Sequence, residues 1–68
     1  MDNWVSVFTT HQVHQAEIVK TLLEEEDLRP VIINKRDSSY KLGYYEVFVL
    51  QEEALKATNL IENEIKFE

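Results

Sequence analysis

The segment from Asn34 to Gly43 carries the densest group of side chains that could do chemistry. It combines cationic groups with hydroxyls and an amide, and its candidate binding residues are Asn34, Lys35, Arg36, Ser38, Ser39, Tyr40 and Lys41. Together with free backbone amides, these donors suit a small anion or an acidic segment of a partner protein. The alternative stays open that this is a hairpin loop whose basic residues only balance an acidic chain. In either case, we expect Arg36 to Gly43 to form a loop between two strands, because Asp, two Ser and the only Gly favour turns.

A catalytic role for the same segment is the competing hypothesis. Ser38 and Ser39 could act as nucleophiles only with a positioned base. Asp37 is the nearest carboxylate in the sequence, but an Asp there is typical of a turn, and Glu17 has no evident carboxylate partner. We therefore expect a protein that is not an enzyme, and the alternative is a small hydrolase or transferase that uses Ser38 or Ser39 with Glu17.

Two short patterns contain residue types that bind metals, but neither has the full set of ligands that a metal site needs. His11 and His14 stand three residues apart, which on a helix lets two imidazoles share a metal, but no third ligand is predictable. The acidic run from Glu24 to Asp27 lacks the alternating oxygen ligands and central glycine of a calcium loop. We expect no metal and no cofactor.

The charge distribution limits the partners. The 68-residue chain has a net charge of −6, yet four of its seven basic residues lie between Arg29 and Lys41 with one acid. The acidic remainder repels phosphate backbones, so we expect no nucleic-acid partner. The segment KLGYYEVFV loosely matches an RNA-recognition signature, but Tyr45 and Glu46 replace its small residue and its stacking aromatic.

No part of the sequence indicates a membrane or secretion signal. The longest apolar runs are far shorter than the ~20 residues of a membrane span, and the start MDNWVSVF lacks the features of a signal peptide. We expect a cytoplasmic protein that does not bind a membrane.

The elements that must position these side chains alternate between strand and helix. β-branched and aromatic runs indicate strands, 3.6-residue periodicity indicates helices, and Thr10 is a candidate helix N-cap. The expected elements are a strand from Trp4 to Thr9, a helix from about His11 or Gln12 to Glu26, a strand from Val31 to about Lys35, a strand from Tyr44 to Leu50 and a helix from about Glu52 to about Ile65. Residues 66–68 could fray or add a short edge strand.

This order predicts a single α+β domain spanning residues 1–68. A β-α-β-β-α sequence with right-handed crossovers gives a ferredoxin-like sandwich, with an antiparallel sheet and both helices on one face. The inward face of the first helix is expected to comprise Ala16, Val19 and Leu23, with Leu22 at its edge. That of the second is expected to comprise Ala54, Ala57, Thr58, Ile61 and Ile65.

The other face of the sheet is expected to be an interface. Strict alternation turns Val5, Val7, Val47 and Val49 to the helices and leaves four aromatic residues on the open face: Trp4, Phe8, Tyr44 and Phe48. A chain this short has a thin core, and without cysteine it has no disulfide to reinforce it. We therefore expect a homodimer that buries the open face.

Several packing and loop residues resemble a known family. The run QAEIVK, then LLE, Leu28, VIINK and the loop KRDSSY look like a family of prokaryotic signal-transducing proteins, small domains of unknown function, in the version found in Bacteroidetes-type bacteria. The resemblance covers Trp4 to Ile61. It implies a βαββα ferredoxin-like fold akin to the PII nitrogen-signalling proteins, and it implies no particular ligand. Many relatives have Gly where this chain has Asp27, which bears on how the first helix ends.

Overall fold

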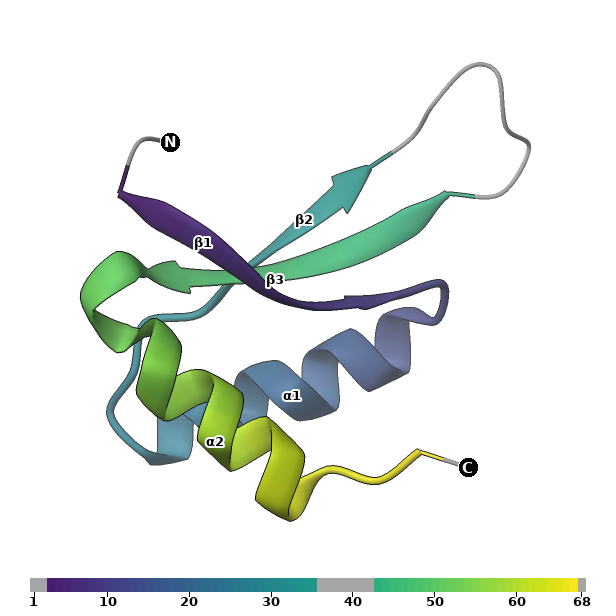
Figure 1. Cartoon of the computed structure of the whole chain (residues 1–68). Coiled ribbons are helices and arrows are strands. Elements are labelled where there is room, and N and C mark those ends of the chain that lie inside the picture. Colours follow the sequence, from purple (N-terminus) through teal and green to yellow (C-terminus); the bar gives the residue numbers. More distant parts are fainter. Residues whose placement is uncertain (1–2, 36–42, 68) are drawn as a thin grey trace.

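The computed structural model describes residues 3–35 and 43–67 of the chain, and everything structural below refers to them. Three strands form one antiparallel sheet in the order β1-β3-β2, and both helices cover the same face of it (Figure 1). The elements are β1 (Trp4–Thr10), α1 (Val13–Glu25), β2 (Val31–Lys35), β3 (Tyr44–Leu50), a 3₁₀ turn (Gln51–Glu53) and α2 (Ala54–Glu64). The predicted α+β class is confirmed, and the described sheet has three strands.

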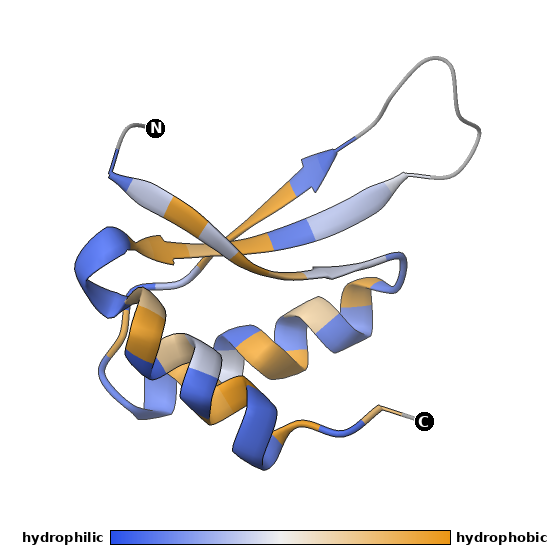
Figure 2. Ribbon diagram, viewed as in Figure 1, coloured by the Kyte–Doolittle hydropathy of each residue, from blue (hydrophilic) through white to orange (hydrophobic). Residues whose placement is uncertain are grey.

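The core lies between the central strand and the two helices. Six side chains have no exposed surface: Ala16, Val19 and Leu23 from α1, Val47 and Val49 from β3, and Ala57 from α2. All six were expected to face inward. Figure 2 shows hydrophobic and hydrophilic positions alternating along both helices, as expected for helices with one buried side.

One position of α2 was predicted wrongly. Thr58 is exposed, whereas Leu60 packs against the core. At 100° per residue, these two positions flank the stripe formed by Ala57 and Ile61 on opposite sides. The helix is therefore rotated so that the side bearing Leu60, and not the side bearing Thr58, faces the core.

A β-bulge in β1 overturns a second expectation. Ser6 pairs with Phe48 and Phe8 pairs with Val47, so Val7 is an extra residue between them. Beyond an extra residue, the alternation of side chains shifts by one position. Phe8 therefore shares the helix-covered face with Val47, and its ring lies 5.9 Å from that of Phe67. The prediction that Phe8 belongs to the open face is wrong.

The start of α1 also differs from the expectation. The Thr10 hydroxyl accepts a hydrogen bond from the Gln12 amide at 3.1 Å and donates one to the Gln15 side chain at 2.6 Å. This arrangement forms a turn before the helix rather than a cap on it. The N-cap is Gln12, and the helix begins at Val13.

The end of α1 is closed by a left-handed residue that is not glycine. Asp27 has φ of 65°. The amides of Asp27 and Leu28 donate to the carbonyls of Glu24 and Leu23, each at 3.0 Å, which is a Schellman motif. Leu28 then packs against the core, and the chain turns at buried Pro30 into β2.

The start of α2 is tied to its neighbours through Glu53. Its Oε1 accepts hydrogen bonds from the amides of Leu50 and Arg29, each at 3.3 Å. One carboxylate thus joins the end of β3 to the connection between α1 and β2. Nearby, the Lys56 ammonium donates to the Glu26 carbonyl at 3.4 Å. Neither α1 nor α2 is long and apolar enough to cross a membrane.

Candidate functional site

The predicted binding segment is attached to one end of the sheet. Lys35 pairs with Tyr44 at this end, whereas the 3₁₀ turn follows Leu50 at the other (Figure 1). Asn34 and Lys35 are both exposed. The remaining candidates, Arg36, Ser38, Ser39, Tyr40 and Lys41, lie outside the described residues.

The sheet becomes more polar toward this end. Figure 2 shows β3 as hydrophobic in the half next to the 3₁₀ turn and less so toward Tyr44. The fully buried residues of β3, Val47 and Val49, both lie in the hydrophobic half, and toward the loop only Tyr45 of β3 packs against the core. A change of charge at that end should therefore disturb folding little.

His11 belongs to this end as well, which the sequence analysis did not anticipate. Its Nδ1 lies 3.2 Å from the Gly43 carbonyl oxygen, so it can donate a hydrogen bond there, and its ring meets that of Tyr44 edge-on at 6.4 Å. The contact spans 32 residues of sequence, which is why no local pattern indicates it. His14 lies elsewhere, along α1. The described residues contain no group of three or more His, Cys, Asp or Glu side chains that could hold a metal ion.

Lys35 connects the loop end to the open face of the sheet. Its ammonium lies 5.9 Å from the centroid of the Phe48 ring, within the range of a cation–π interaction. The side chain therefore runs along the open face. At this position it can neutralise an anion at the loop or a carboxylate of a molecule packed on the sheet.

The open face holds three of the four predicted interface residues, Trp4, Tyr44 and Phe48, all partly buried. The strand register places further apolar side chains beside them and two charges of opposite sign. The set is Trp4, Ser6, Thr9, Val31, Ile33, Lys35, Tyr44, Glu46, Phe48 and Leu50, here called the open-face set. None of its aromatic members packs against the core.

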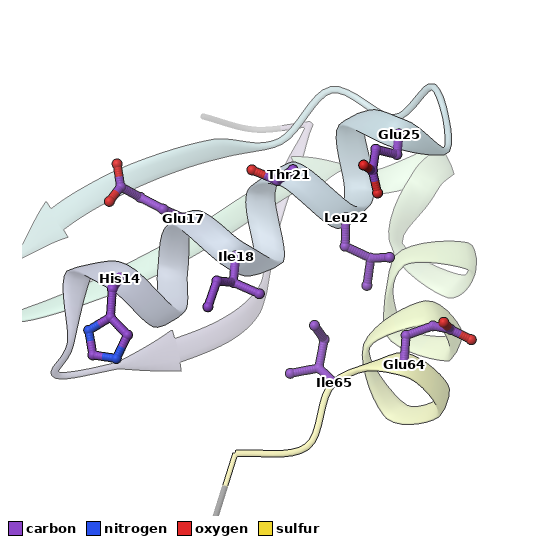
Figure 3. Close-up of a pocket in the computed structure, with 8 residues that line it drawn as sticks. All are labelled: His14, Glu17, Ile18, Thr21, Leu22, Glu25, Glu64 and Ile65. Carbon is purple, nitrogen blue, oxygen red and sulfur yellow. The ribbon is translucent and has the colours of Figure 1, made fainter.

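A shallow groove of about 550 Å³ runs along the outer side of α1, beside the end of α2 (Figure 3). Its lining comprises His14, Glu17, Ile18, Thr21, Leu22, Glu25, Glu64 and Ile65. Glu17, the carboxylate of the hydrolase or transferase hypothesis, lines this groove. No local sequence pattern indicates the groove, because Glu64 and Ile65 reach it from beyond α1.

Comparisons of the chain with protein-family profiles, with curated proteins and with solved structures found no match.

Proposed function

We propose that this chain is a ferredoxin-like binding or regulatory module without catalytic activity, which engages an anion or an acidic partner segment through residues 34–43. The observation that carries the proposal is the concentration of Lys35, Arg36 and Lys41 within one short segment of a chain with net charge −6. Exposed Asn34 and Lys35 provide donors at the start of the segment, and His11 adds an imidazole next to Gly43. A local cluster of positive groups on an acidic chain favours an anionic ligand and orients its approach.

The ferredoxin-like assignment is part of this proposal. In the sheet order β1-β3-β2, the two outer strands run parallel to each other and α1 connects them across β3. A ferredoxin-like sheet has the same arrangement with a fourth strand beside the first. The resemblance to prokaryotic signal-transducing proteins also favours a regulatory role over a metabolic one.

We further propose that the module is a homodimer formed through the open-face set. The face is mainly apolar and has no cover among the described residues. It also carries Lys35 and Glu46, so a two-fold axis through the face can place each cation against the partner's carboxylate. Such pairing makes a second copy of this chain a suitable occupant.

The catalytic alternative has no specific observation in its favour. Glu17 is exposed on α1 and lines the groove shown in Figure 3. Ser38 and Ser39 lie outside the described residues. The described residues therefore add no support to the hydrolase or transferase hypothesis.

The test of the loop is a pair of charge-matched double variants. Arg36→Gln with Lys41→Gln should abolish the binding of inorganic phosphate, nucleotides or an acidic peptide, whichever the unaltered protein binds in calorimetry. Its melting temperature should stay within about 2 °C, because exposed charges contribute little to stability. The control, Lys20→Gln with Lys66→Gln, removes the same charge elsewhere and should bind normally. Equal binding by both double variants, or no binding of any such probe by the unaltered protein, would refute the proposal.

A further inference from the structure

The groove on α1 has an apolar floor that nothing in the described structure covers. Ile18 and Leu22 point from α1 toward Ile65, which follows α2 (Figure 3). Ile18 leaves 48% of its surface exposed, and it lines the groove together with Leu22 and Ile65. The floor is therefore a concave apolar strip rather than a single exposed residue.

The border of the strip is acidic. Glu17, Glu25 and Glu64 line the groove, and no Lys or Arg is among its lining residues. The only described ion pair on α1, Lys20 with Glu24 at 3.9 Å, involves neither these carboxylates nor the groove lining. The negative potential at the groove is therefore not offset by a cation within it.

The dimensions of the strip fit a helix. From His14 to Glu25 the lining residues recur every three or four positions over eleven helical steps. At 1.5 Å per residue, this corresponds to about 16 Å, or three turns of a partner helix. Such a helix would place apolar residues at i, i+3 or i+4 and i+7 on the floor.

The negative charge of the groove distinguishes between the molecules that could occupy it. A second copy of this chain would bring the glutamates of one α1 against those of the other, which opposes association. Phe67, the last described residue, packs on Phe8 and is not among the residues that line the groove. A helix with an apolar stripe flanked by lysines or arginines complements both the floor and the border.

We propose that this groove binds a basic amphipathic helix of another protein. The inference does not rest on the proposed function, because it concerns a different site. The loop is basic, so it would repel the helix that the groove is proposed to bind. The module thus has two binding surfaces of opposite charge, one at the loop end of the sheet and one on the outer side of α1.

The test uses a peptide of about 14 residues containing only leucine and lysine, with leucine at the helical spacing i, i+3, i+4 and i+7. A scrambled peptide of the same composition is the control. We expect the helical peptide alone to bind, with amide NMR shifts confined to α1 from His14 to Glu25 and to the end of α2. Binding should weaken steeply as salt rises from about 0.05 M to about 0.5 M, because screening removes the attraction.

Matched variants separate the groove from nonspecific attraction. Ile18→Lys should weaken binding at least about tenfold, because it removes apolar contact area and adds a repelling charge. Leu55→Lys makes the same change at a residue that is 76% exposed on α2 outside the groove, and should change the affinity less than about twofold. Likewise, Glu17→Gln with Glu25→Gln should weaken binding more than Glu52→Gln with Glu62→Gln.

The proposal would be overturned by equal binding of the scrambled peptide, by equal effects of Ile18→Lys and Leu55→Lys, or by NMR shifts centred on the sheet. Peptide binding that survives Arg36→Gln with Lys41→Gln would show that the groove acts without the loop. Loss of peptide binding in that double variant would place the peptide at the loop and would also overturn the proposal.

Discussion

At the scale of single residues, Asp27 has a side chain that is unfavourable for its backbone conformation. It adopts φ of 65° to end α1, a conformation that costs a residue with a Cβ about 1–2 kcal/mol and costs glycine little. It also places a negative charge at the C-terminal end of the helix, which is the negative end of the helix dipole. The motif forms nonetheless, because Leu28 beyond it packs against the core.

We predict that Asp27→Gly stabilises the protein by about 0.5–1 kcal/mol, because the relief of backbone strain exceeds the entropy that glycine adds to the unfolded chain. Urea denaturation monitored by circular dichroism measures the effect. Asp27→Asn is the control, since it removes the charge and keeps a side chain, and it should recover less than half of the gain. A gain from Asn equal to that from Gly would assign the effect to charge instead.

At the scale of elements, the bulge in β1 determines which aromatic residues belong to which face. One inserted residue, Val7, turns Phe8 toward α2 and the C-terminal segment, while Trp4 before the bulge stays on the open face. β1 thus contributes one aromatic residue to the folded core and another to the proposed interface.

The prediction at this scale compares two phenylalanines. Phe8→Ala should destabilise the domain by about 2 kcal/mol at every protein concentration, because a partly buried ring is lost from the core side. Phe48→Ala should instead destabilise it mainly at high protein concentration, where a dimer adds to stability. Chemical denaturation at two protein concentrations distinguishes them. The assignment of faces would fail if the cost of Phe48→Ala were as large and as independent of concentration as that of Phe8→Ala.

At the scale of the whole molecule, the limiting feature is the small core. Six fully buried side chains, two of them alanines, are little for a domain, and a chain of this size buries only about 60% of the surface that it exposes when unfolded. The open-face set is a further group of mainly apolar side chains outside this core. Covering it with a second copy would add stability that the single chain lacks.

We therefore predict a dimer in sedimentation at micromolar concentration, with a red shift of Trp4 fluorescence on dilution as the open face becomes hydrated. Phe48→Lys should shift the protein toward monomer before it unfolds it, because the new charge meets the partner rather than the core. Leu55→Lys, on the outside of α2, is the control and should leave the association unchanged. A protein that stays monomeric at all concentrations, with constant Trp4 fluorescence, would contradict the dimer.

Local periodicity was enough to predict most of the fold. The positions of Ala16, Val19 and Leu23 follow from 100° per residue on a helix, and the alternation of Val47 and Val49 follows from the two-residue repeat of a strand. Both repeats are properties of a few consecutive residues, so the sequence specifies them before any tertiary contact forms. The same reasoning predicted β2 and β3. The order of the elements, taken with right-handed crossovers, predicted that both helices cover one face of the sheet.

What the sequence could not determine depends on contacts between distant segments. The bulge exists only as a mismatch between β1 and β3, so the side of the sheet on which Phe8 lies could not be read from β1 alone. The approach of His11 to Gly43 and of Ile65 to Ile18 likewise required the folded chain. The basic loop was evident from composition, whereas the acidic groove was not, because its residues come from two helical segments that only tertiary packing brings together.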